Sequence, residues 1–324
     1  MPLTVTDLAK RYGSEWVLKQ ASFTADEGTI TGIFGPKGCG KSTLLRMIAG
    51  LETPNGGSIA TGDGPKPSSN SNDGIAYVPT FPASSFLKRA FGGNDTNSVD
   101  IADRHAAAID EALSGSDTVI LLDDALCFFD EPTKRSYFQK LRDAVRSRGL
   151  SVVYAANNFG DLLTICDKLI VIAEGQVQQE GIPEDVYLEP ANRLVASITG
   201  RNNLIDARRL SSSKTDLPEF QTLTGEHRLH AQKIDRSGLG AINQNVTLAV
   251  RPEHISISFG ASFPEDNLIK ASIAGYRFLG PLTMVDLDAN GLIIQAYVTR
   301  LVGLNVGDEC MVGLPPDRIR ILKS

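Results

Sequence analysis

Two short stretches of the sequence carry residue types that suit phosphate chemistry. The first, residues 35–43, reads GPKGCGKST and matches the pattern G-x-x-x-x-G-K-[ST] in full. Its glycines let backbone N–H groups turn toward an anion, Lys41 can reach the outer phosphates of a nucleotide, and Ser42 can offer its hydroxyl to Mg²⁺. Because the pattern is complete, a glycine turn that merely joins two elements is the less favoured interpretation. The candidate phosphate-binding residues are Gly35, Pro36, Lys37, Gly38, Cys39, Gly40, Lys41, Ser42 and Thr43.

The second stretch is an apolar run, residues 118–122, that ends in the carboxylates of Asp123 and Asp124. An apolar strand that ends in this way places its carboxylates at the carboxyl edge of a parallel sheet, where phosphates and metals bind. Asp123 is therefore a candidate ligand of Mg²⁺, usually through water. Asp124 is a candidate to orient or deprotonate an attacking water. An acidic pair in an ordinary turn is the alternative, and the glycine stretch upstream makes it less favoured.

The elements around these residues predict an α/β domain. Residues 29–34 are typical of a buried strand, and residues 42–50 of a helix closed by Gly50. The helix N-terminus adds a partial positive charge beside the glycine loop. Further along, helix patterns at 131–148 and 159–166 alternate with apolar strand patterns at 150–156 and 168–173. This alternation predicts a mostly parallel sheet with helices on its faces.

From about residue 201 the periodicity changes. Short apolar or alternating runs follow one another, separated by turn signals such as 289–291, which reads ANG. They predict a small β-barrel or a β-sandwich, and the pattern alone leaves both open.

Composition excludes several classes of protein. The chain has 324 residues, enough for two domains, and its 42% hydrophobic and 22% charged residues are ordinary for a globular protein. A net charge of −6 gives no electrostatic support for a nucleic-acid partner. No basic start followed by an apolar stretch indicates a signal peptide, and no long apolar run predicts a transmembrane segment. The four cysteines are scattered without metal-site spacing, which favours free thiols.

Together these landmarks resemble the ATP-binding subunits of ABC transporters, in particular importer subunits with a C-terminal TOBE-type domain from iron, polyamine, sulfate and sugar systems. Residues 35–52 resemble the Walker A stretch throughout, and residues 122–130 the Walker B segment and D-loop. Two stretches, 180–187 and 190–196, are similar to the segment that leads into the barrel, and residues 249–255 to a TOBE hallmark. The resemblance covers nearly the whole chain.

The resemblance implies an ABC-type P-loop NTPase domain over residues 1–200, with a reduced helical subdomain at 81–117. It implies a linker and the start of the β domain at 201–244, and a TOBE-like, OB-like barrel at 245–324. ATP and Mg²⁺ are the implied cofactors, with Ser42 and Asp123 at the metal.

Tyr12 lies where the family has its adenine-stacking aromatic residue, although composition alone favours a half-buried strand residue at this position. The sequence also departs from the family. Thr80 stands in place of the Gln that reaches metal and water, Asp124 in place of the catalytic Glu, and Asn157 in place of the switch His. Asn can donate a hydrogen bond to a phosphate but cannot carry a proton or a positive charge.

The signature motif is the largest departure. Counting back from residue 123 places it at 99–103, which reads VDIAD and lacks the Ser and the two glycines that approach a partner's γ-phosphate. Residues 113–116 read LSGS, but they follow a predicted helix instead of preceding it, so a turn is expected there. The helical arm that docks on a permease is also shortened.

The resemblance therefore implies an ATP-binding subunit of an importer, peripheral to the cytoplasmic face of the membrane. Its implied partners are permease subunits, a second ATP-binding subunit in a homodimer or heterodimer, and indirectly a solute-binding protein. The losses at Thr80, Asn157 and the signature motif favour an alternative, which is a catalytically weak or inactive ATP-binding subunit, or one that needs a partner with an intact signature. The sequence thus leaves hydrolysis open, with Lys41 and Asp124 as the candidate catalytic residues.

Overall fold

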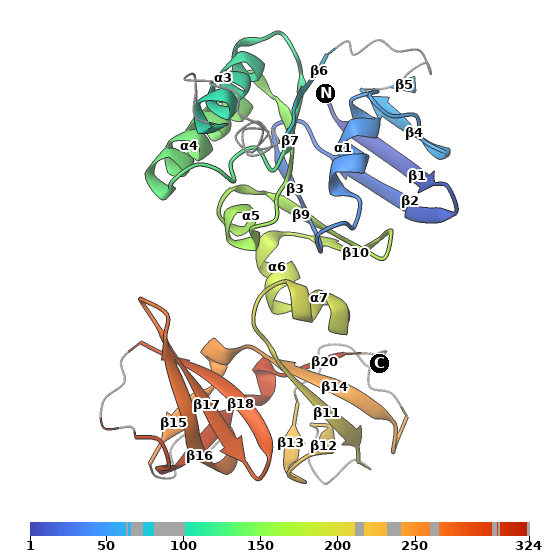
Figure 1. Cartoon of the computed structure of the whole chain (residues 1–324). Helices are drawn as coiled ribbons and strands as arrows, with labels where there is room; N and C mark the ends of the chain where they lie inside the picture. Colours follow the sequence, from blue (N-terminus) through green and yellow to red (C-terminus); the bar gives the residue numbers. More distant parts are fainter. Residues whose placement is uncertain are drawn as a thin grey trace, which may run out of the picture. The chain divides into compact units, whose positions relative to one another are not determined.

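The structure is a computed structural model that describes residues 1–62, 64–65, 74–80, 101–210, 217–231, 241–259, 266–299, 303 and 305–322. The chain divides into two compact units, Met1–Val186 and Tyr187–Ser324. Each has its own sheets and its own core (Figure 1).

The first unit is built on a sheet of ten strands. Their order is β5-β4-β1-β2-β10-β9-β3-β8-β7-β6. The strands are β1 (Leu3–Tyr12), β2 (Glu15–Ala25), β3 (Ile30–Phe34), β4 (Gly56–Thr61), β5 (Gly64–Pro65), β6 (Ile75–Val78), β7 (Val119–Asp123), β8 (Ser151–Ala155), β9 (Lys168–Ala173) and β10 (Gln176–Gly181).

The part of this sheet that bears the site is parallel. Strand β3 pairs in parallel with β8 and β9, and β7 pairs in parallel with β6 and β8. Because these strands run the same way, the loops after β3, β7 and β8 all leave from one edge of the sheet. The mostly parallel sheet expected from the sequence is confirmed, and β1, β2, β4 and β5 add an antiparallel extension.

The helices that cover this sheet are α1 (Lys41–Ile48), α3 (Ile101–Ser114), α4 (Glu131–Arg148) and α5 (Phe159–Ile165). Helix α6 (Pro183–Leu188) follows β10 in the chain and spans the division between the units. Helix α1 buries Leu44, Leu45 and Met47 in a core shared with β3, β7 and β8. Helix α4 occupies the predicted residues because Asp130 caps its start and Gly149, with a φ of 64°, ends it. The reduced helical subdomain predicted at 81–117 is seen only as α3, since residues 81–100 lie outside the described ranges.

The second unit begins with helix α7 (Arg193–Ile198) and contains two five-stranded antiparallel sheets. Their orders are β13-β12-β11-β14-β20 and β15-β19-β16-β17-β18. The strands are β11 (Asn203–Arg209), β12 (Glu219–Thr222), β13 (Arg228–His230), β14 (Asn245–Val250), β15 (Ser256–Ser258), β16 (Asn267–Phe278), β17 (Thr283–Ala289), β18 (Leu292–Val298), β19 (Glu309–Leu314) and β20 (Arg320–Leu322). Residues 201–244, expected as a linker and the start of the β domain, hold β11, β12 and β13.

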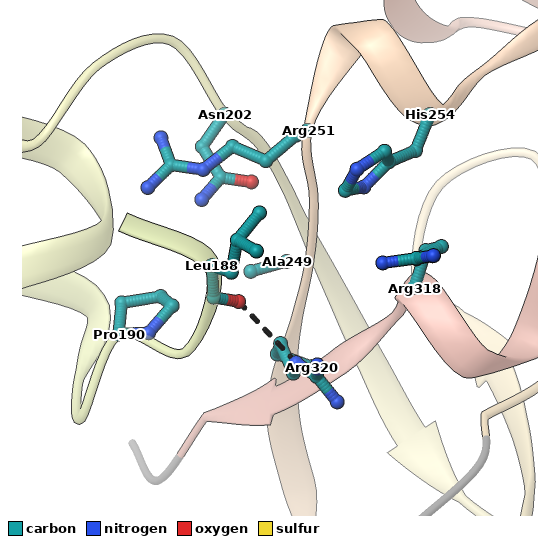
Figure 2. Close-up of a pocket in the computed structure, with 8 residues that line it drawn as sticks. All are labelled: Leu188, Pro190, Asn202, Ala249, Arg251, His254, Arg318 and Arg320. Carbon is teal, nitrogen blue, oxygen red and sulfur yellow. Dashed lines mark hydrogen bonds between the residues drawn. The ribbon is translucent and has the colours of Figure 1, made fainter. Parts of the chain in front are cut away.

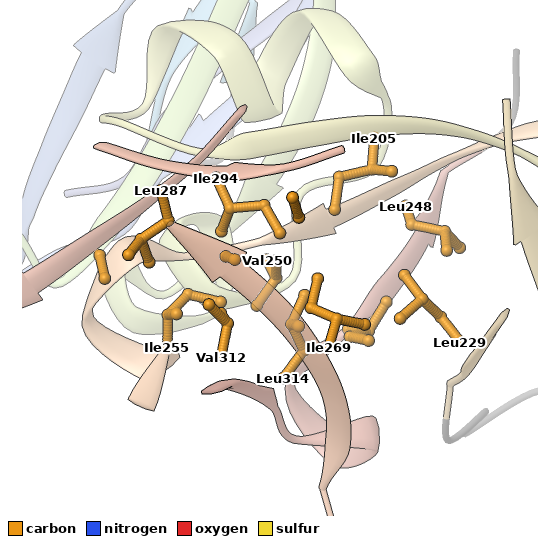
Figure 3. Close-up of a cluster of buried hydrophobic side chains, with 14 of the residues drawn as sticks. Ile205, Leu229, Leu248, Val250, Ile255, Ile269, Leu287, Ile294, Val312 and Leu314 are labelled. Atoms are coloured by element: carbon orange, nitrogen blue, oxygen red, sulfur yellow. The ribbon is translucent and has the colours of Figure 1, made fainter. Parts of the chain in front are cut away.

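One apolar core joins the two sheets of the second unit (Figure 3). Ile205 and Leu248 enter it from the first sheet, and Ile269, Ile294 and Val312 enter it from the second. Buried residues alternate with more exposed ones along β16 from Asn267 to Ala274, as a strand with one buried face requires. The predicted all-β second domain is confirmed.

Candidate functional site

The phosphate loop follows β3 and ends at the first turn of α1. At two of its glycines a larger residue would clash with neighbouring atoms. A Cβ at Gly35 would lie 2.0 Å from the carbonyl oxygen of Ile172, and a Cβ at Gly40 would lie 2.9 Å from Val17. Gly40 also has a φ of 100°, which an L side chain rarely adopts, and it caps the N-terminus of α1. The loop therefore passes close to its neighbours and opens directly into a helix N-terminus.

Lys41 lies against this loop and is only 8% exposed. Its Nζ donates to the carbonyl oxygen of Gly35 at 2.8 Å and to that of Pro36 at 3.2 Å. The ammonium group is thus held over the space that the loop encloses. Burial raises the pKa of the neighbouring Cys39 thiol, so this thiol is neutral at pH 7.

Asp123 ends β7 beside the loop and accepts two side-chain hydrogen bonds. Ser42 Oγ donates to Oδ1 at 2.9 Å, and Tyr77 Oη donates to Oδ2 at 3.1 Å. The Thr80 hydroxyl donates to the backbone carbonyl of Asp123 and so ties the end of the β6 segment to β7. Burial raises the pKa of the Asp123 carboxyl, while the two hydrogen bonds and the charge of Arg46 oppose that shift.

These oxygens fit the donor set that Mg²⁺ prefers. A serine hydroxyl and a carboxylate oxygen 2.9 Å apart are hard ligands on adjacent elements, and bound phosphates would supply the rest of the shell. The described residues hold no group of three or more His, Cys, Asp or Glu side chains that could bind a metal by themselves. Ser42 and Asp123 therefore fit a metal that arrives with a nucleotide.

Asp124 is held by Asn157, which follows β8. Asn157 Nδ2 donates to Oδ2 at 2.7 Å, and its backbone N–H donates to Oδ1 at 3.2 Å. Asp124 has a φ of 51°, and its own N–H donates to the carbonyl oxygen of Ala155 at 2.7 Å. This left-handed backbone turns the carboxylate out of the strand direction, and Asn157 fixes both of its oxygens.

Tyr12 lies near the end of β1 and its side chain is 47% exposed. Its hydroxyl donates to Glu52 Oε2 at 2.6 Å, and Glu52 Oε1 accepts from Arg46 Nε at 3.0 Å. The ring is therefore exposed and tied to the residues just after α1.

The segment predicted at the signature position is only partly described. Residues 99–100 lie outside the described ranges, and residues 101–103 form the first turn of α3. Helix α3 ends at Ser114, and the Gly115 N–H donates to the carbonyl oxygen of Glu111 at 3.0 Å. Leu113 and Ser114 thus end the helix, and residues 115–116 bend away after it, so this segment does not precede a helix as a signature motif would.

A small cavity lies in the second unit beside Asn202, His254 and Arg318 (Figure 2). Asn202 Oδ1 and His254 Nδ1 are buried there without a hydrogen-bond partner among the described residues. Its volume is about 10 Å³, which is room for one water molecule. The cavity is too small for a nucleotide, so the phosphate loop remains the candidate site.

Comparisons with known proteins agree with this geometry. Residues 18–118 match the ABC transporter family, and residues 248–322 match the TOBE domain. The chain therefore contains an ABC transporter domain. It carries a C-terminal TOBE domain, as expected.

Similar proteins span almost all of this chain. The Fe(3+) ions import ATP-binding protein FbpC of Photorhabdus laumondii is 25% identical over 98% of the chain and 95% of its own length. FbpC of Agrobacterium fabrum is 28% identical over 88% of the chain and 90% of its own length. The spermidine/putrescine import ATP-binding protein PotA of Clostridium acetobutylicum is 24% identical over 99% of the chain and 96% of its own length.

Among solved structures, cbiO1 of Clostridium perfringens, part of the ABC transporter complex cbiONQ, covers 58% of this chain and 90% of its own chain. The identity is 21% and the TM-score 0.49. In the described ranges, no helix combines the length and hydrophobicity needed to cross a bilayer.

Three residues of the ABC site escaped the sequence reasoning. Tyr77 donates a hydrogen bond to Asp123. Glu52 accepts one hydrogen bond from Tyr12 and another from Arg46. The signal for Glu52 was its place two residues after Gly50, which ends the first helix, and Tyr77 lies three residues before Thr80. Neither carries a motif of its own, so only the fold shows their contacts.

Proposed function

We propose that this chain is the ATP-binding subunit of a solute importer and couples ATP binding and hydrolysis to uptake through a separate permease. The observation that carries this proposal is the Ser42–Asp123 contact of 2.9 Å at the mouth of a complete phosphate loop. Relatives of matching length, named as import ATP-binding proteins, support it.

In this proposal the loop N–H groups and Lys41 bind the phosphates, and the exposed ring of Tyr12 stacks on the base. Lys41 exchanges its bonds with Gly35 and Pro36 for phosphate oxygens, which keeps the buried ammonium paired. Ser42 and Asp123 hold Mg²⁺, which when bound neutralises charge on the phosphates. The other loop residues, Pro36, Lys37, Gly38, Cys39 and Thr43, shape the cradle.

Asp124 is the proposed general base toward the attacking water. The two hydrogen bonds from Asn157 fix the direction of its carboxylate. Asn157 cannot accept the proton as an imidazole would, so the proton stays on Asp124 or passes to phosphate. Thr80 acts by tying its loop to Asp123 instead of reaching the metal.

The proposed partners are permease subunits, a second ATP-binding subunit and, indirectly, a solute-binding protein. The proposed location is the cytoplasmic face of the membrane. The names of the relatives give no support to the alternative of an inactive ATP-binding subunit. The proposal therefore includes ATP hydrolysis by this chain.

Mg-ATP binding by calorimetry and steady-state ATP hydrolysis test the proposal on the full chain. Lys41→Ala should abolish both, because it removes the charge that faces the phosphates. Lys270→Ala, an exposed lysine of the second unit, serves as the matched control and should change neither. Absence of Mg-ATP binding by the wild-type chain overturns the proposal. Binding without turnover, alone and in a permease complex, overturns its hydrolytic part.

A further inference from the structure

A carboxylate joins the exposed tyrosine of β1 to helix α1. Glu52 accepts a hydrogen bond of 2.6 Å from the Tyr12 hydroxyl with one oxygen, and a charge-assisted bond of 3.0 Å from Arg46 with the other. The Glu52 side chain is 23% exposed and that of Arg46 is 39% exposed. Both oxygens of this carboxylate are therefore engaged, and one of them restrains the tyrosine ring.

The backbone fixes Glu52 before its side chain does. Gly50, with a φ of 72°, ends α1 in the left-handed conformation. The chain then turns back, so that the N–H groups of Leu51 and Glu52 donate to the carbonyl oxygen of Arg46 at 2.8 and 3.2 Å. The backbone turn thus brings Glu52 next to Arg46. Their side chains therefore lose little further conformational freedom when they form the ion pair.

The residues after Glu52 are bonded to the end of β1. The Asn55 N–H donates to the carbonyl oxygen of Ala9 at 2.8 Å, and Asn55 Oδ1 accepts from the Arg11 N–H at 2.9 Å. Lys10 Nζ donates to the carbonyl oxygen of Thr53 at 2.8 Å. These contacts place the segment 52–55 against β1 and bring Glu52 to the Tyr12 hydroxyl.

Lys10 also lies over the Tyr12 ring, with Nζ 5.3 Å from its centroid. The ring is therefore held at its hydroxyl by Glu52 and on one face by Lys10, while nearly half of the side chain remains exposed. A planar ring held in this way presents its other face in a fixed direction. That arrangement suits a flat aromatic ligand such as a purine.

We propose that Glu52 is a positioning residue for the nucleotide base, because it fixes the Tyr12 ring before the base stacks on it. The inference rests on the proposed function, in which Tyr12 stacks on adenine. Binding costs less free energy when the receiving side chain is already ordered. Glu52 does not contact the phosphates in this account, so its effect should appear only with ligands that carry a base.

The test compares Mg-ATP with Mg-tripolyphosphate, which has the phosphates but no base. Dissociation constants are measured by calorimetry for the wild-type chain, Glu52→Gln, Tyr12→Phe and the double variant. Each single variant should weaken Mg-ATP binding roughly 2- to 10-fold, the range expected for one side chain that must be ordered on binding. Mg-tripolyphosphate binding should stay unchanged. The double variant should lose little more than the more affected single variant, since both changes act on the same contact between Glu52 and Tyr12.

Glu27→Gln is the matched control. Glu27 pairs with the N-terminal amine at 3.1 Å and precedes β3, at the sheet edge opposite the phosphate loop. Its substitution should change neither dissociation constant. Thermal unfolding of each variant separates a folding defect from a binding effect, and Tyr12→Phe keeps the test decisive if Glu52→Gln unfolds.

Equal losses for Mg-ATP and Mg-tripolyphosphate, or full additivity in the double variant, would overturn the positioning role while leaving ATP binding intact. Failure of the wild-type chain to bind Mg-ATP would instead overturn the proposed function. The two failures are therefore distinguishable in one set of titrations.

Discussion

At the scale of single residues, the site carries a buried carboxylate whose charge is unfavourable in the folded protein. Asp123 is 5% exposed, and burial raises its pKa despite the hydrogen bonds from Ser42 and Tyr77. The folded state therefore binds the carboxyl proton of Asp123 more tightly than the unfolded chain does. The destabilisation is absent well below pH 4, the ordinary range of the Asp pKa, and fully present above the raised pKa.

Asp123→Asn should consequently stabilise the nucleotide-free protein at pH 7, by on the order of 1 kcal/mol or about 2–4 °C in Tm. The gain should shrink as the pH falls toward 4, where the wild-type carboxyl is protonated. The variant should also lose the stabilisation that Mg-ATP gives the wild type. Differential scanning calorimetry measures all three, with the exposed Asp103→Asn as control. An unchanged or lower Tm at pH 7 would contradict the argument.

Cys127 is exposed, yet burial of its thiol and the adjacent Asp124 carboxylate raise its pKa to about 11. The thiolate is the reactive form, so alkylation of Cys127 should be slow at pH 8 and rise about tenfold per pH unit up to pH 10. Asp124→Asn removes one cause of the shift and should speed the reaction. Mass spectrometry after iodoacetamide labelling gives the rate, and fast wild-type labelling at pH 8 would refute the prediction.

At the scale of elements, a nearly buried ion pair joins α4 to α5. Lys134 Nζ lies 3.0 Å from Asp161 Oδ2, and the two side chains are 11% and 9% exposed. Helix α5 follows the Asn157 segment, so this pair helps to place the loop that holds Asp124. Removing one partner leaves a buried charge without compensation.

Lys134→Met should therefore destabilise the protein by about 3–5 kcal/mol in denaturant unfolding. The exposed pair Arg135–Glu131, at 3.3 Å with side chains 75% and 65% exposed, is the control. Arg135→Ala should cost less than about 1 kcal/mol, because surface pairs are screened by water. Similar losses for the two variants would show that the first pair is also largely solvated.

At the scale of the whole molecule, the second unit holds a complete core. Ile205, Leu248, Ile269 and Val312 share one cluster, and every strand pair of its two sheets lies within residues 203–322. Asn203 links the sheets, since its Nδ2 donates to the Gln295 carbonyl oxygen at 2.8 Å and its Oδ1 accepts from the Gln295 N–H at 2.7 Å.

A fragment of residues 187–324 should therefore fold alone and unfold cooperatively. Circular dichroism during thermal unfolding and dispersion of amide resonances test this. Asn203→Ala in the fragment should lower its stability by about 1–3 kcal/mol, because buried partners lose their hydrogen bonds. A fragment without a cooperative transition would contradict the prediction.

Much of this protein was predictable from local sequence. The phosphate loop, the carboxylates that end β7 and the bounds of α4 follow from short patterns, because turn glycines, caps and apolar periodicity act over a few residues. The change from an α/β to an all-β unit was visible in the periodicity for the same reason. Strands β11 to β13 were harder to predict, because short strands with many polar residues give a weak signal.

The sequence by itself determined which residues can bind phosphate and metal, and in which elements they lie. Only the tertiary structure decided their partners: that Tyr77 joins Ser42 on Asp123, that Asn157 holds Asp124, and that Glu52 ties Tyr12 to α1. The physical reason is that these contacts join residues 33 to 81 positions apart along the chain. Local propensity carries no information over such distances, whereas strand order and register bring the side chains together at one edge of the sheet.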